Sequence, residues 1–241
     1  MNLLLDIGNT QIKAAFAEGN KLIRILPKLN LDETLHLLSR ESFQYLMISA
    51  VGECPTAIRD FINEAPGRFL LHGHLPLPFR NHYQTPHTLG TDRIAAIAGG
   101  LSLFPGVGIL AIDAGSCITY DVADAQGDYW GGSISPGLQM RCRAMHTFTA
   151  RLPLVSVQEE DTKQPIYGNT TKAALQSGAL YGTIAEITQM IRMYEDKFGT
   201  LQTIICGGDA PLLSRKLKIS HQVVPELIFI GLNRILLHNV S

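Results

Sequence analysis

The first segment with residues suited to chemistry is Asp6-Ile7-Gly8-Asn9-Thr10, and Lys13 follows it closely. Glycine lets the backbone approach a phosphate, and turn N–H groups with a Thr hydroxyl can bind its oxygens. A carboxylate such as Asp6 only accepts hydrogen bonds, so beside phosphates it would act through Mg²⁺ or Mg²⁺-bound water. Lys13 can supply positive charge to the same group. Taken alone, the segment is explained more simply by an ordinary hairpin, because Gly-Asn is favoured in tight turns. It also lacks the G-x-x-x-x-G-K-[ST] pattern of a P-loop.

A second segment repeats this pattern in the other half of the chain. Asp113-Ala114-Gly115-Ser116 follows an apolar run, as Asp6 does, and Asp113 lies 107 positions after Asp6. A repeat at about half the chain length indicates two related lobes. Two such hairpins facing each other would clamp the phosphates and metal of a nucleotide from both sides. Gly207-Gly208-Asp209 would form a wall beside the base, although a turn-capping role is the simpler interpretation of Asp209 itself.

Leu89-Gly90-Thr91-Asp92-Arg93 is the third candidate segment, and it opens an expected helix after a polar loop. Thr91 or Asp92 would serve there as a plain N-cap. In the alternative interpretation, Asp92 accepts the proton of an attacking alcohol while Arg93 holds an anionic group of the substrate. The base in phosphoryl transfer mainly orients the hydroxyl. An adjacent Arg favours the ionised carboxylate that this role requires.

The elements that must position these residues alternate between strands and helices. Apolar runs bounded by turn residues predict strands, and three-to-four spacing of apolar residues predicts helices. Such alternation is typical of an α/β fold. We expect strands over 2–7, 11–17, 45–51, 108–113 and 203–206, an irregular loop over 71–89, and helices around 35–38, 57–65, 93–103, 180–198 and 227–237.

Composition excludes several classes of protein. Of the 241 residues, 46% are hydrophobic and 17% charged, which is enough apolar material for a folded core. The net charge of −1 argues against binding to nucleic acid or an anionic membrane, since both need clustered positive charge.

The four cysteines are scattered with no C-x-x-C pair, which favours reduced thiols in the cytoplasm. The start lacks the basic region of a signal peptide. Glycines and Pro105 interrupt the uncharged stretch 94–112, so we expect no membrane span there.

The paired Asp-x-Gly loops resemble those of the actin-like kinase superfamily, which includes actin, Hsp70 and sugar kinases. A more specific resemblance rests on four motifs that occur in order over nearly the whole chain. Together they are similar to the type III pantothenate kinases, also called the Bvg accessory factor-like family. The motifs are Asp6-x-Gly8-Asn9-Thr10, Tyr83 upstream of Gly90-x-Asp92-Arg93, Asp113-x-Gly115, and Gly131-Gly132-x-Ile134-x-Pro136-Gly137.

This resemblance implies a role for each matching residue. Asp92 would be the proton acceptor, and Asp113 would bind a monovalent cation, potassium or ammonium. Ser116 stands where the family usually has Thr and keeps the hydroxyl, and Cys117 replaces a small residue beside it, where we expect it to pack. The residues implied to bind ATP are Asp6, Ile7, Gly8, Asn9, Thr10, Gln11, Ile12, Lys13 and Ser116. Those implied to contact pantothenate are Tyr83, Gly90, Thr91, Asp92, Arg93 and Thr171, although Thr170 leaves the register of Thr171 open.

The resemblance further implies a fold of two duplicated ribonuclease H-like lobes, 1–108 and 109–241, with a nucleotide cleft between them and the last helix packed back on the first lobe. The implied activity is phosphorylation of pantothenate to 4′-phosphopantothenate by ATP with Mg²⁺, the first step of coenzyme A biosynthesis. The implied enzyme is a cytoplasmic homodimer, with Gly178 and Gly182 of the long helix near the interface. Two alternatives stay open, namely a kinase of another alcohol or sugar and a non-catalytic nucleotide-binding regulator.

Overall fold

The chain divides into two compact units in the structure, a computed structural model that describes residues 1–8, 11–163 and 165–240. Each unit is built around a β-sheet. The chain passes between the units repeatedly, so neither unit is one continuous segment. Unit 1 comprises Met1–Val107, Ala125–Gly131 and Glu226–Ser241, and unit 2 comprises Gly108–Asp124 and Gly132–Pro225.

The sheet of unit 1 has the strand order β3-β2-β1-β4-β5. Its central strand β1 runs antiparallel to β2 and parallel to β4. β1 is buried on both faces, which explains why its sequence is an almost continuous apolar run. The strands are β1 (Asn2–Ile7), β2 (Ile12–Glu18), β3 (Lys21–Leu29), β4 (Tyr45–Ala50) and β5 (Arg68–Leu70).

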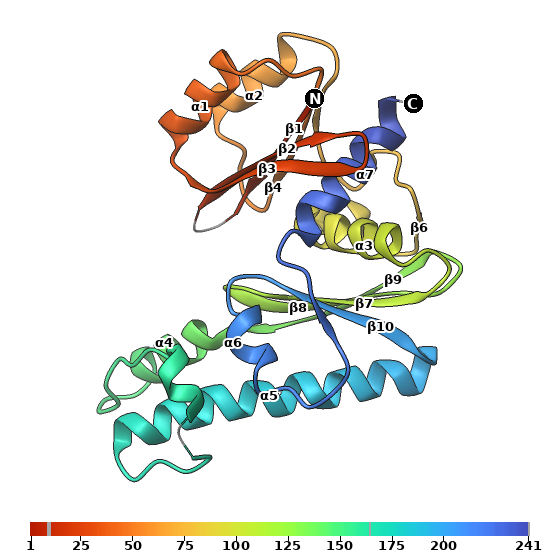
Figure 1. The fold of residues 1–241 in the computed structure, drawn as a ribbon. Helices are drawn as coiled ribbons and strands as arrows, with labels where there is room; N and C mark the ends of the chain where they lie inside the picture. The colour runs from red at the N-terminus through yellow and green to blue at the C-terminus, as the bar shows by residue number, and fades with distance from the viewer. Residues whose placement is uncertain (9–10, 164, 241) are drawn as a thin grey trace. The chain divides into compact units, whose positions relative to one another are not determined.

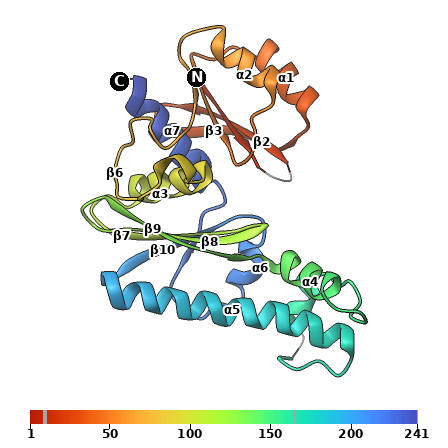
Figure 2. The ribbon, with the colours of Figure 1, turned by 180° about the vertical axis from the view of Figure 1, so that it is seen from behind.

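Helices cover both faces of this sheet (Figures 1 and 2). On one face, alternate residues of β1 such as Leu3 pack with α1 (Leu31–Arg40) and α2 (Thr56–Asn63). On the other face, α7 (Leu227–Val240) contacts β1 and β4 and packs against α3 (Thr91–Leu103). The C-terminal helix therefore belongs to the same unit as the N-terminal strands.

The backbones of α3 and α7 touch directly. A Cβ atom at Gly231 of α7 would overlap the carbonyl oxygen of Ala95, and a Cβ atom at Gly99 of α3 would overlap the carbonyl oxygen of Leu227. Only glycine leaves room for so close an approach. The helix at the end of the chain thereby supports α3, whose first turn carries Thr91, Asp92 and Arg93.

The sheet of unit 2 repeats the topology of unit 1. Its order is β11-β10-β7-β8-β9, with the two-residue strand β6 (Arg80–Asn81) beside the first residues of β9. β7 runs antiparallel to β8 and parallel to β10. The strands correspond in chain order, β1 to β7, β2 to β8, β3 to β9, β4 to β10 and β5 to β11, and corresponding strands have the same neighbours in the two sheets. This match confirms the duplicated α/β lobes expected from the Asp6 and Asp113 repeat. The strands are β7 (Gly108–Ala114), β8 (Cys117–Ala123), β9 (Asp128–Pro136), β10 (Leu201–Cys206) and β11 (Gln222–Val223).

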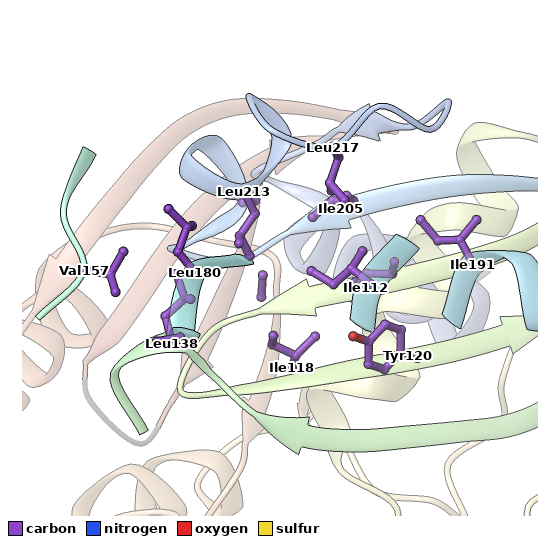
Figure 3. Close-up of a cluster of buried hydrophobic side chains, with 14 of the residues drawn as sticks. Ile112, Ile118, Tyr120, Leu138, Val157, Leu180, Ile191, Ile205, Leu213 and Leu217 are labelled. Atoms are coloured by element: carbon purple, nitrogen blue, oxygen red, sulfur yellow. The ribbon is translucent and has the colours of Figure 1, made fainter. Parts of the chain in front are cut away.

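The core of unit 2 lies between its sheet and the long helix α5 (Thr171–Phe198), which follows one face of the sheet (Figures 1 and 2). Leu180 and Ile191 of α5 pack with Ile112 of β7 and Tyr120 of β8 (Figure 3). The shorter helices α4 (Leu138–Thr147) and α6 (Ala210–Ser214) add Leu138 and Leu213 to the same cluster, as do two partly extended segments through Val157 and Leu217.

The expected elements are confirmed in position, with shifts of a few residues at their ends. The long helix begins at Thr171, before the periodic face that predicted it. The edge strand β3 was not predicted, since it carries a proline and most of its residues are exposed, and the strands β5, β6 and β11 are too short to leave a periodic pattern. Among the described residues, no helix is both long enough and apolar enough to cross a membrane.

Candidate active site

Asp6 lies between two polar residues on neighbouring strands of unit 1. The pairing register places it opposite Lys13 of β2 on one side and Ser49 of β4 on the other. The Ser49 hydroxyl hydrogen-bonds the Asp6 carboxylate, and the charges of Lys13 and Asp92 both act on it. The structure thus brings Asp92, which lies far along the sequence, near Asp6, the strand partner of Lys13.

Burial raises the pKa of Asp6 from 3.8 to about 6. The nearby Asp92 carboxylate acts in the same direction, whereas Lys13 and the hydrogen bond from Ser49 oppose the shift. The Oδ1 atom of Asp6 is buried and has no hydrogen-bond partner among the residues that the structure describes. A buried carboxylate oxygen without a donor fits a cation or a cation-bound water, so Asp6 suits the Mg²⁺ of a nucleotide.

The rest of the first hairpin is described only in part. Ile7 is the last residue of β1 and Ile12 the first of β2, and the N–H of Gly8 donates to the carbonyl of Gln11 at 3.1 Å. Asn9 and Thr10, which were expected to bind ATP, lie outside the described residues.

Asp92 lies in the first turn of α3, and that turn is tied to the end of β4. The Thr91 hydroxyl lies 2.9 Å from the Ser49 hydroxyl and donates to the carbonyl of Ala50 at 3.0 Å. The N–H of Arg93 donates to Oδ1 of Asp92 at 2.8 Å, which orients the carboxylate. A Cβ atom at Gly90 would lie 2.6 Å from that same oxygen, so the glycine makes room for it. Burial raises the pKa of Asp92, against the opposing effect of Arg93.

Tyr83 and Arg93 also lie together in unit 1, as expected for two residues of one substrate site. The Arg93 guanidinium is centred 5.5 Å from the middle of the Tyr83 ring and its side chain is buried. Tyr83 stacks on Tyr129 with ring centres 6.3 Å apart. Its N–H is held by the side chain of Asn81 at 2.9 Å. A Cβ atom at Gly131 would lie 3.1 Å from the Tyr83 ring, so the glycine motif accommodates that ring.

Asp113 of unit 2 ends strand β7 beside the turn Gly207-Gly208-Asp209. Gly207 has a φ of +90° and faces the Asp113 carboxylate and the Ala114 carbonyl, both of which a Cβ atom would overlap. The N–H of Asp209 donates to the same Ala114 carbonyl at 2.9 Å. Asp209 occupies the N-cap position of α6 but makes no side-chain capping bond, and burial raises its pKa. Two oxygen atoms therefore converge on a space that only glycine keeps open.

Ser116 sits at the exposed tip of the second hairpin, between β7 and β8. The N–H of Gly115 donates to the carbonyl of Cys117 at 2.9 Å and closes this turn. The N–H of Gly137 donates to the carbonyl of Ser116 at 3.2 Å, and a Cβ atom at Gly137 would overlap the carbonyls of Gly115 and Ser116. The glycine motif that ends β9 thus packs directly on the hairpin.

Thr171 is the first residue of α5, and its side chain is exposed. The neighbouring Thr170 is the N-cap, and its hydroxyl accepts a hydrogen bond from the N–H of Ala173 at 3.1 Å. Because capping already engages the Thr170 hydroxyl, Thr171 stays the candidate for a substrate contact.

Two features of unit 1 were not visible in the sequence. Ser49, which links Asp6 to Thr91, stands in an otherwise apolar strand, and this break in pattern was the only signal of its role. A cavity of about 330 Å³ opens at the N-terminus of α3, where its walls include Gly90, Thr91 and three histidines, His72, His74 and His87. Within the described residues, no three His, Cys, Asp or Glu side chains form a metal-binding cluster.

Comparison with known proteins places the chain in a family. The model of a family described as type III pantothenate kinase matches residues 2–193. A relative of that name from Cytophaga hutchinsonii is 37% identical over 241 residues and covers 100% of both chains. Another from Porphyromonas gingivalis is 38% identical over 242 residues and covers 99% of both chains.

Solved structures agree with this fold. A protein of Campylobacter jejuni assigned to the Baf family of transcriptional activators superposes with a TM-score of 0.64 at 24% identity, covering 99% of this chain and 98% of that one. A protein of Listeria monocytogenes assigned as an N-acetylmannosamine kinase superposes with a TM-score of 0.59 at 15% identity, covering 100% and 99%. These superpositions extend over nearly the whole chain and show that it shares its fold with both proteins. The chain belongs to the type III pantothenate kinase family.

Proposed function

We propose that this chain phosphorylates the terminal hydroxyl of pantothenate with ATP, the first step of coenzyme A biosynthesis. The observation that carries the proposal is the placement of Asp92 beside Asp6 and Lys13 at one end of the unit 1 sheet. A carboxylate suited to accept a proton and a carboxylate suited to Mg²⁺-bound phosphates thus lie together. Membership of the type III pantothenate kinase family names the alcohol that is phosphorylated.

Asp92 orients the attacking hydroxyl and accepts its proton. The raised pKa of Asp92, caused by burial, makes the carboxylate a better proton acceptor than an exposed one. The N–H of Arg93 holds one of its oxygens, so the acceptor is fixed before the substrate arrives. Phosphoryl transfer passes through a loose transition state, so positioning and electrostatics supply most of the catalysis.

Asp6 and Lys13 would hold the nucleotide in unit 1. Mg²⁺, when bound, would neutralise phosphate charge. Asp6 would hold that ion or one of its waters through the buried Oδ1, and Lys13 would bind phosphate from the opposite strand. The residues that we assign to ATP are Asp6, Ile7, Gly8, Asn9, Thr10, Gln11, Ile12, Lys13 and Ser116.

Arg93 and Tyr83 would hold pantothenate. Arg93 would bind the carboxylate of the substrate, and its contact with the Tyr83 ring keeps the guanidinium in place. Gly90 and Thr91 form the wall beside Asp92, and Thr171 at the start of α5 would add a hydroxyl.

A coupled ADP-release assay with pantothenate and Mg-ATP tests the activity and the role of Asp92. Asp92→Asn should keep Mg-ATP binding but lower kcat by about two orders of magnitude or more, because the general base is gone. Asp60→Asn, which alters an exposed carboxylate of α2, should leave kcat unchanged. Turnover close to wild type in the Asp92 variant would remove Asp92 from this role.

The monovalent cation is proposed to bind at Asp113. The Asp113 carboxylate and the Ala114 carbonyl converge at Gly207, and such a set of oxygens suits a hard cation. The same assay in potassium, ammonium and sodium chloride should show activity with the first two and little with sodium. Asp113→Asn should reduce the difference between the salts. Equal rates of the wild type in all three salts would contradict the cation assignment.

Two other functions are separated by the same assay. A kinase of a sugar would release ADP with members of a sugar panel and not with pantothenate. A non-catalytic regulator would bind Mg-ATP and release no ADP with any alcohol. The match of a Baf family structure draws attention to this second case, but the described site keeps Asp6, Asp92, Arg93 and Asp113.

The oligomer is proposed to be a homodimer formed through α5. Gly178 and Gly182 lie four residues apart on this helix, and both are exposed. Nothing among the described residues lies within 4 Å of a Cβ atom placed at either position. These glycines therefore serve no close approach within one chain, and a second copy of the chain remains the proposed partner.

A further inference from the structure

A partly buried charge network in unit 2 joins the long helix α5 to strand β9 and helix α4. Its centre is Glu186 of α5. The Tyr120 hydroxyl donates to Oε1 of Glu186 at 2.9 Å, and the Ser135 hydroxyl donates to the same oxygen. Arg141 of α4 forms an ion pair with Oε2. Tyr120 of β8 is fully buried in the core drawn in Figure 3.

The network continues from Arg141 to the second hairpin through direct contacts. The Nε of Arg141 donates to the carbonyl of Pro136 at 2.8 Å. The next residue, Gly137, donates its N–H to the carbonyl of Ser116 at 3.2 Å. No side chain fits between Gly137 and the hairpin, because a Cβ atom would overlap the carbonyls of Gly115 and Ser116. A shift of Pro136 would therefore displace the Gly115–Ser116 turn of the hairpin.

The chemistry of the network argues for positioning rather than for stability alone. The Arg141 and Glu186 side chains are 21% and 27% exposed, so desolvation and solvent screening offset much of their attraction and the net gain in stability is small. A bond from Arg141 to a carbonyl oxygen, combined with an ion pair to Glu186, fixes direction as well as distance. Glu186 stays ionised, since hydrogen bonds from Ser135, Arg141 and Tyr120 outweigh the effect of burial and lower its pKa.

We propose that Glu186 and Arg141 are positioning residues that hold the Gly115–Ser116 turn in the geometry needed to bind the phosphates of ATP. This inference rests on the proposed function, because it assumes that Ser116 contacts ATP. Neither Glu186 nor Arg141 needs to touch the nucleotide. Their effect passes through Pro136, Gly137 and the carbonyl of Ser116.

The test compares two sets of variants in the full chain. Glu186→Gln removes the charge that pairs with Arg141. Arg141→Lys keeps a positive charge but loses the planar guanidinium, whose N–H groups reach both Glu186 and Pro136. Tyr194→Phe is the matched control, because it removes the Ser133–Tyr194 hydrogen bond of 2.9 Å, which also joins β9 to α5 but does not lead to the hairpin.

We expect Glu186→Gln and Arg141→Lys to weaken Mg-ATP binding about tenfold by calorimetry. KM for pantothenate should change less than about twofold, since its assigned contacts are not part of the network. Hydrogen exchange at residues 115–118 should speed up in both variants. Tyr194→Phe should alter neither the Mg-ATP affinity nor this exchange, whatever it does to the melting temperature.

Several results would overturn the inference. Unchanged Mg-ATP affinity and unchanged exchange at 115–118 in Arg141→Lys would leave the network a purely structural role. A fall in Mg-ATP affinity of equal size in Tyr194→Phe would show general loosening of unit 2. If the wild type binds Mg-ATP but does not phosphorylate pantothenate, the proposed function fails while the affinity comparison still tests the network. If the wild type does not bind Mg-ATP, and Ser116→Ala likewise shows no binding, both proposals fail.

Discussion

At the scale of single residues, Asp6 is the group in which function and stability oppose each other. Its carboxylate is buried at a strand end, and burial raises its pKa to about 6. A raised carboxyl pKa means that the folded state prefers the protonated form. The stability that this provides is complete below about pH 4 and is lost as the pH rises through about 6. At neutral pH the ionised Asp6 therefore destabilises the protein while it offers a charge to Mg²⁺.

Asp6→Asn should raise the free energy of unfolding at pH 7.5 without nucleotide by on the order of 1–3 kcal/mol, because the buried charge is removed. Urea unfolding measures this change. At pH 5, where much of Asp6 is already protonated in the wild type, the gain should shrink. A variant less stable than the wild type at pH 7.5 would contradict the buried-charge explanation.

The same substitution has a functional counterpart. Mg-ATP binding to the wild type should weaken as the pH falls through about 6, since Asp6 loses its charge. Asp6→Asn should bind more weakly throughout, and its affinity should lack the pH dependence that Asp6 causes. Titrating both proteins in parallel separates the ionisation of the enzyme from that of the nucleotide.

At the scale of elements, the contact between α3 and α7 decides where the first turn of α3 lies. Gly231→Ala should lower the free energy of unfolding by about 1–3 kcal/mol, because the new methyl group meets the Ala95 carbonyl. This loss should exceed the gain of about 1 kcal/mol in helix propensity. Gly52→Ala is the control, since no described atom lies within 4 Å of its Cβ position.

Activity gives a second measurement of the same contact. Displacement of α3 moves Thr91 and Asp92 relative to the end of β4, so kcat of Gly231→Ala should fall while that of Gly52→Ala stays near wild type. A Gly231 variant with unchanged stability and unchanged kcat would show that the helix pair adapts without moving the site.

At the scale of the whole molecule, the homodimer is proposed to form through α5, the helix that begins at Thr171. Light scattering should give a mass near twice the 26.4 kDa of one chain. Gly182→Glu should shift the protein toward the monomer, because a charged side chain would fill the face that we assign to the partner. Gly52→Glu, in unit 1, should leave the mass unchanged. A monomeric wild type would contradict the proposal.

The sequence by itself determined the fold class and predicted most residues of the candidate site. The apolar runs, the repeat of Asp6 at Asp113 and the Gly90–Arg93 motif carry their information locally, because strand and helix periods and turn residues are short-range signals. Even the duplicated topology followed from the repeat, and the matching strand orders confirm it.

Only the tertiary structure decided which residues surround these motifs. Ser49, the neighbour of Asp6, meets Thr91 across 42 positions of sequence, and Glu186 meets Tyr120 across 66. The contact of Gly231 with Ala95 is more distant still. No local pattern predicts such pairs, because strand register and helix crossing depend on how the whole core packs. The raised pKa of Asp6 has the same origin, since it arises from burial and from a carboxylate on another element.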